Sequence, residues 1–117
     1  VDIRQNCSKI IFMWVFTNKG FVSIVQHNTK KNTFIVRARF EEHIKNLFPD
    51  ANVLKTPDAD YRFRAFISKQ IVSKVIASNI DNIDYGNFKN SIDSRPYHDA
   101  CINVWGDMYR AQQRFYD

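Results

Sequence analysis

Two segments of this 117-residue chain alternate apolar and arginine side chains with a period of two, and this pattern constrains the fold most. Successive side chains of a β-strand point to opposite faces of the sheet. In the segment 61–68 the apolar residues that share one face are Tyr61, Phe63, Ala65 and Ile67. In the segment 33–40 the corresponding residues are Phe34, Val36, Ala38 and Phe40. The opposite faces carry Arg62 and Arg64 in the first segment and Arg37 and Arg39 in the second. The pattern predicts two strands of a half-buried sheet.

Three further strands are expected. Residues 10–17 and 21–27 are rich in β-branched and aromatic residues, and the turn Asn18-Lys19-Gly20 joins them into a hairpin. A short strand is expected over residues 52–55. Because polar turns separate the first three strands, they should form an antiparallel meander.

Apolar spacing changes to the helical period in three places. We expect helices over residues 40–48, from the N-cap Ser68 to about Ile83, and from Pro96 to about Arg114. We therefore predict an α+β fold, with one antiparallel sheet of about five strands and helices mainly on one face. The predicted order is β-β-β-α-β-β-α-α. A ferredoxin-like relationship is the nearest alternative, although the leading meander departs from that order.

The length of the chain fits one domain over residues 1–117, with residues 1–9 as a flexible arm. An apolar content of 44% excludes general disorder. Cys7 and Cys101 lie far apart without metal-ligand or redox spacing, so we expect neither a disulfide nor a metal, and no cofactor. No apolar run reaches membrane-spanning length. These features predict a cytoplasmic protein with no membrane partner.

The formal net charge is +5, and it is concentrated in the part of the chain that forms the sheet. Residues 1–50 contain eight Lys and Arg and four Asp and Glu. Residues 84–117 contain four Lys and Arg and five Asp and Glu. A basic surface favours nucleic acid or another polyanion as a partner. The alternative is that the charge serves solubility alone.

The strongest candidate site is a set of arginines with one aromatic residue on the open face of the sheet: Arg37, Arg39, Arg62, Arg64 and Phe66. Guanidinium groups bind phosphate oxygens bidentately and stack on bases. An aromatic residue among arginines suits single-stranded nucleic acid. One alternative is that Asp58, Asp60 or nearby glutamates pair with the arginines in exposed salt bridges. Another is that the third helix covers this face.

Sequence patterns for catalysis are weak, and we predict that the protein is not an enzyme. The three histidines match no metal-ligand or acid–base spacing, and Cys101 falls on an apolar helical stripe. The tryptophans and phenylalanines are expected mainly in the core. The alternative function is a protein-interaction module, such as a phage or host accessory factor. Such a module would act through an aromatic or edge-strand surface. The same kind of surface could join two copies of the chain into a homodimer.

Several short motifs also occur together in this chain. They are Met13-Trp14-Val15-Phe16-Thr17, Lys19-Gly20-Phe21, Val36-Arg37-Ala38-Arg39, Asp60-Tyr61-Arg62-Phe63-Arg64, Asp84-Tyr85-Gly86-Asn87-Phe88-Lys89, His98-Asp99, Val104-Trp105 and Met108-Tyr109. The joint pattern covers residues 13 to about 112 and resembles an uncharacterised family of small bacterial and phage proteins. The resemblance implies a bacterial or phage cytoplasmic setting and carries no activity.

Overall fold

The computed structural model describes residues 11–116, so the arm expected over residues 1–9, with Cys7, lies outside the described residues. The chain divides into two compact units, with the boundary between Ile83 and Asp84. Among the described residues, the first unit contains a five-stranded sheet and two helices, and the second contains a short 3-10 helix and one long α-helix. The predicted α+β class is confirmed.

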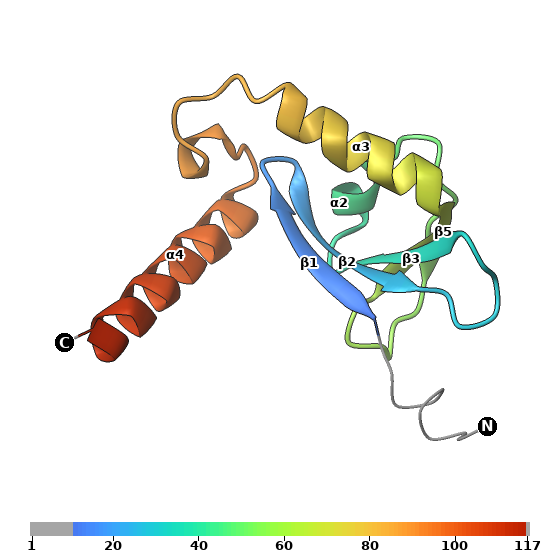
Figure 1. Cartoon of the computed structure of the whole chain (residues 1–117), viewed down its shortest axis with the longest axis horizontal. Coiled ribbons are helices and arrows are strands. Elements are labelled where there is room, and N and C mark those ends of the chain that lie inside the picture. The colour runs from blue at the N-terminus through green and yellow to red at the C-terminus, as the bar shows by residue number, and fades with distance from the viewer. Residues whose placement is uncertain (1–10, 117) are drawn as a thin grey trace. The chain divides into compact units, whose positions relative to one another are not determined.

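The sheet is antiparallel throughout, and the order of strands across it is β1-β2-β3-β5-β4. The strands are β1 (Phe12–Thr17), β2 (Gly20–Gln26), β3 (Thr33–Ala38), β4 (Leu54–Lys55) and β5 (Phe63–Ser68). The first three form the expected meander, and β5 extends it by pairing with β3 (Figure 1). Strand β5 lies between β3 and β4, which run parallel to each other and are connected through α2, as in the split βαβ arrangement of ferredoxin-like folds. The leading meander β1-β2-β3 is the departure from the usual ferredoxin-like order that the sequence predicts.

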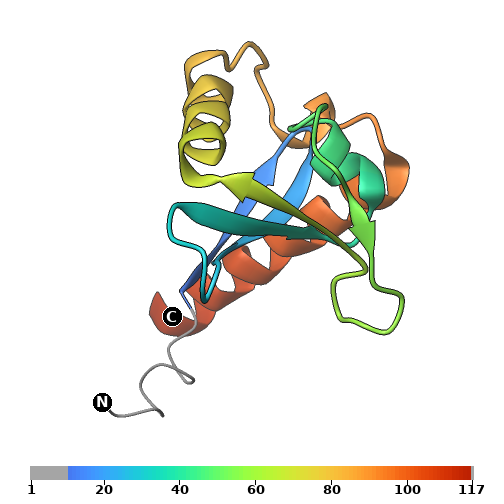
Figure 2. The same ribbon diagram turned by 90° about the vertical axis from the view of Figure 1, so that its right-hand side faces the viewer.

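The hydrophobic core lies on one face of the sheet, which we call the inner face. Its buried strand residues recur at every second position: Val22, Ile24, Val36, Ala38, Ala65 and Ile67. Helix α2 (Glu41–Lys45) and the turn after it add Ile44, Leu47 and Phe48, and helix α3 (Lys69–Asp81) adds Val72. Since these residues belong to one cluster, α2 and α3 cover the same face of the sheet (Figure 2).

Helix α3 begins as the sequence predicts, because the hydroxyl of Ser68 accepts a hydrogen bond from the Ile71 N–H at 3.2 Å. Its apolar stripe is only partly buried. Val72 is buried, whereas Ile80, which the helical period places in the core, is 64% exposed. That placement was wrong, because the helix continues beyond the residues that pack against β3 and β5.

The ends of the two arginine strands also differ from the prediction. Tyr61 precedes β5 in a bend, and its ring contacts Phe21 and the guanidinium of Arg37, which lie on the face opposite the core. Phe40 follows β3, serves as the N-cap residue of α2 and is exposed. The period of two therefore stops at Ala38 and begins at Phe63, since residues outside a strand do not continue its alternation.

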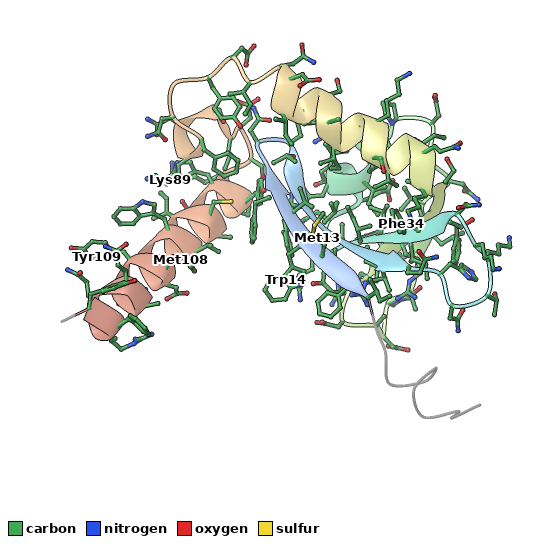
Figure 3. All side chains as sticks on the ribbon, in the orientation of Figure 1. Met13, Trp14, Phe34, Lys89, Met108 and Tyr109 are labelled. Atoms are coloured by element: carbon green, nitrogen blue, oxygen red, sulfur yellow. The ribbon has the colours of Figure 1, made fainter. Side chains whose placement is uncertain are left out.

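The second unit contains the 3-10 helix η1 (Lys89–Ser91) and helix α4 (Arg95–Tyr116). The first apolar residues of α4, Tyr97 and Cys101, are buried. The later ones are exposed: Ile102, Val104, Trp105, Met108, Tyr109 and Phe115. The rings of Trp105 and Tyr109 stack at 5.6 Å, and the Lys89 ammonium lies 4.7 Å from the Trp105 ring centroid (Figure 3). Helix α4 is thus amphipathic, with an apolar stripe that is largely accessible.

Candidate polyanion-binding face

The face of the sheet opposite the core, here called the outer face, is defined by the pairing of the strands. Cross-strand partners share a face, so one row contains Trp14, Ser23, Arg37, Arg64 and Leu54. The neighbouring row contains Phe12, Val25, Ile35 and Phe66, and a third contains Phe16 and Phe21. Arginines therefore occupy the middle of the face, with aromatic residues on β1 at one side and Phe66 on β5.

The strands contribute no negative charge to the outer face. The five strands contain no Asp or Glu, and their charged residues are Arg37, Lys55 and Arg64. Arg37 and Arg64 are direct cross-strand partners, so two positive side chains lie side by side. Like charges in this position repel one another and destabilise a sheet unless a counter-charge is bound.

Arg37 and Arg64 are also incompletely hydrogen-bonded. Among residues 11–116, neither forms an ion pair with a carboxylate. The Nε atoms of both are buried and have no hydrogen-bond partner in the described part of the chain. One terminal nitrogen of Arg37 donates to the Ser23 hydroxyl at 2.8 Å. A buried donor without an acceptor costs about 1–3 kcal/mol, so an anion bound between these two groups would remove a penalty that the protein otherwise carries.

Arg39 is arranged differently from Arg37. Its guanidinium carbon lies 4.2 Å from the centroid of the Tyr61 ring, and that of Arg37 lies 4.6 Å from the same centroid. Arg39 also forms an exposed salt bridge with Asp60 at 3.3 Å. For Arg39, then, the alternative of a surface ion pair applies, and such a pair contributes little to stability. The Tyr61 ring therefore makes cation–π contacts with two guanidiniums, at the end of the outer face where β3 ends and β5 begins.

The two remaining predicted site residues flank the arginine pair. Phe66 lies on the outer face, is 49% exposed, and its ring packs against His27 at 5.5 Å. Arg62 is exposed and directly precedes β5. Within the described residues its side chain forms no ion pair. The structure thus brings Arg37, Arg39 and Arg64 together, with Phe66 beside them, and leaves Arg62 at the periphery.

The aromatic residues of β1 lie on the outer face, although the sequence predicts them in the core. Trp14 is 61% exposed, and Phe12 and Phe16 are exposed on the same face. Trp14 contacts Phe21 edge-on at 6.1 Å, and Phe16 stacks on Phe21 at 4.4 Å. Figure 3 shows Trp14 projecting from β1, whereas Phe34 on β3 belongs to the inner face. The sequence contained a pattern that indicates a shared face, because Phe12, Trp14 and Phe16 recur at every second position, as the arginines do.

The buried titratable side chains include His43 on α2 and Tyr97 and Cys101 on α4. Nδ1 of the buried His43 accepts a hydrogen bond from the Phe21 N–H at 3.1 Å, and burial lowers the pKa of His43. Burial raises the pKa of both Tyr97 and Cys101, which are hydrogen-bonded to each other. Cys101 is a buried free thiol, and a protonated thiol in such a place is a poor nucleophile. Residues 11–116 contain no cluster of three or more groups suited to hold a metal.

No helix in the described part of the chain has both the length and the apolar character needed to span a membrane. No protein-family model, curated protein or solved structure matches this chain.

Proposed function

We propose that this protein is a small binding module that contacts nucleic acid or another polyanion through the outer face of its sheet. The observation that carries the proposal is the cross-strand pair Arg37 and Arg64, whose buried Nε donors have no acceptor among the described residues. A phosphate group offers several acceptor oxygens and a negative charge, and it would satisfy both guanidiniums at once. Arg39 and Phe66 border the pair, and Arg62 would join once an extended anion is bound.

Solubility alone is a weaker explanation for these arginines. A charge that serves solubility needs full contact with water, whereas Arg37 and Arg64 are partly buried and Arg37 packs against Tyr61. Arginine also offers a planar, bidentate set of donors that lysine lacks. We place this activity in a bacterial or phage cytoplasm, and the resemblance to uncharacterised small proteins of that setting stays a prediction.

The proposal is tested by fluorescence anisotropy with labelled single-stranded RNA and DNA at two salt concentrations. The unmodified protein should bind at low salt and lose affinity as salt rises, because binding to phosphates releases counterions. Replacing Arg37 and Arg64 together by Gln should weaken binding by about tenfold or more, since each charged hydrogen bond is worth roughly 1.5–3 kcal/mol.

The matched control removes the same charge from the helices that cover the inner face. Lys45 on α2 and Lys74 on α3 are exposed, and a Lys45→Gln, Lys74→Gln variant should bind almost as well as the unmodified protein. Absence of binding at low salt, or equal losses in the two double variants, would contradict the proposal.

The exposed stripe of α4 favours a second candidate function, self-association. The stripe contains no charged side chain and includes Trp105 and Met108, the latter 67% exposed. A second copy of this chain presents the same apolar stripe, and burying two such surfaces against each other is favourable. Light scattering coupled to gel filtration should then give twice the chain mass of 13.8 kDa, and Met108→Glu should return the monomer. A monomer at all accessible concentrations of the unmodified protein would exclude the homodimer.

A further inference from the structure

We infer that the anion bound by the outer face is a single-stranded nucleic acid, with one phosphate between Arg37 and Arg64 and neighbouring bases stacked on Trp14 and Phe66. This inference rests on the proposed function and narrows its ligand class. A compact anion or a polyphosphate would need only the arginine pair, whereas a single-stranded nucleic acid would also use the aromatic residues around it. The aromatic residues therefore distinguish a single strand from the other anions.

The aromatic residues are exposed on the same face as the arginines. The aromatic residues of this face with more than one-third of their surface exposed to solvent are Phe12, Trp14, Phe16 and Phe66. The rings of β1 form a continuous group, because Phe12 and Trp14 lie 6.5 Å apart and both Trp14 and Phe16 contact Phe21. Exposed aromatic rings beside Arg37 and Arg64, which have no carboxylate partner among the described residues, form a surface that can stack on bases while it neutralises phosphates.

The spacing of these groups fits separate, unstacked bases. Phe66 is two residues from Arg64 along β5, which corresponds to roughly 7 Å. Trp14 is two strands away from Arg37 in the same cross-strand row, which corresponds to about 10 Å. Arg64 follows Arg37 in that row. Trp14 is therefore three strands away from Arg64, about 14 Å, and farther still from Phe66. Stacked nucleotides rise by only about 3.4 Å along a strand, so these two rings suit bases that have left the stack.

A duplex is a poorer match for this surface. Its base faces are stacked on one another and are not available to aromatic side chains, whereas an extended single strand exposes them. An acidic peptide could neutralise Arg37 and Arg64, but its carboxylates would leave the faces of Trp14 and Phe66 without a planar partner. The combination of charge and exposed rings therefore favours the single strand.

The chain offers a direct reporter for this arrangement. Trp14 and Trp105 are the two tryptophans of the sequence, so a Trp105→Phe variant leaves Trp14 as the sole tryptophan. This variant is titrated with oligothymidylate, with a duplex of equal length and with inorganic polyphosphate. Binding is measured by competition with a labelled oligonucleotide, and Trp14 emission is recorded in parallel.

We expect oligothymidylate to bind and to quench Trp14 emission, because a stacked base changes the environment of the ring. The duplex should bind more weakly, and polyphosphate should compete without a comparable change in emission. If polyphosphate competes and oligothymidylate leaves Trp14 emission unchanged, the proposed anion-binding function holds and the inference fails. If nothing binds, both fail.

A second pair of variants separates stacking from charge. Trp14→Leu with Phe66→Leu should lower affinity for oligothymidylate by roughly fivefold to more than 100-fold, with little effect on polyphosphate, since base stacking contributes about 1–3 kcal/mol. Ile71→Ala with Ile80→Ala is the control, because it removes exposed apolar side chains from α3, which covers the inner face, and it should bind normally. Thermal unfolding verifies that each variant is folded. Equal losses for oligothymidylate and polyphosphate in the first variant would overturn the stacking role.

Discussion

At the residue scale, one contact fixes the junction between the first hairpin and the helix that follows the third strand. A Cβ atom at Gly20 would lie 2.6 Å from Cγ of His43, a distance that real Cβ contacts do not show. The neighbouring Phe21 N–H donates to Nδ1 of the same His43. Glycine is required at position 20 because the imidazole occupies the space of a side chain, and that contact keeps His43 in hydrogen-bonding position.

Replacement of Gly20 by Ala should therefore destabilise the protein by about 1–3 kcal/mol, the usual cost of an overpacked site. Gly86→Ala is the control, because no atom lies within 4 Å of a Cβ at Gly86. That change should alter stability by no more than about 0.5 kcal/mol. Urea unfolding of the two variants measures the difference. Equal stabilities would show that His43 moves aside without cost.

His43 should also make the stability depend on pH. Burial lowers the pKa of its ring in the folded protein, whereas the unfolded chain has the ordinary value of about 6.5. As the pH falls below about 6.5, the unfolded chain takes up a proton that the folded protein resists, so stability decreases; above that pH this contribution is complete.

Urea unfolding between pH 8 and pH 5 measures this effect when the unmodified protein is compared with His43→Gln. The difference in unfolding free energy between the two proteins should be constant above about pH 7 and should shrink toward lower pH. A difference that stays flat over the whole range would mean that His43 does not titrate with unfolding.

At the element scale, alternation predicted the faces of the strands but not their ends. Phe34, Val36, Phe63 and Ile67 lie on the core side, and Arg37, Arg64 and Phe66 lie opposite, as the period of two requires. Tyr61 and Phe40 were misplaced because bends and caps end the alternation, and these depend on tertiary contacts. The cap of α3 was predictable, since a serine before an apolar helical stripe can bond the first free N–H groups.

The cap gives a test at this scale. Ser68→Ala should cost about 1 kcal/mol of stability, because the Ile71 N–H loses its acceptor. Ser73 lies exposed inside the same helix, where alanine is the better helix former, so Ser73→Ala should be neutral or slightly stabilising. If Ser68→Ala were as stable as Ser73→Ala, the hydroxyl would not contribute to the helix start.

At the scale of the whole molecule, the sequence predicted the sheet, its class and the arginine face, but not which aromatic residues would be accessible. An alternating run such as Phe12, Trp14 and Phe16 is the same whether its outer face is covered or open. The outcome depends on what packs there. The two buried Nε atoms could not be foreseen either, because they follow from the register that sets Arg37 beside Arg64.

The central claim is that the Nε donors of Arg37 and Arg64 lack acceptors until an anion binds between the two guanidiniums. Nuclear magnetic resonance of the arginine Nε–H groups tests it most directly, with each signal assigned by an Arg→Lys variant. On addition of a short single-stranded oligonucleotide, the Nε–H signals of Arg37 and Arg64 should shift strongly and exchange more slowly with water. Saturating binding that leaves both signals unmoved would contradict the account, because the anion would then be held elsewhere.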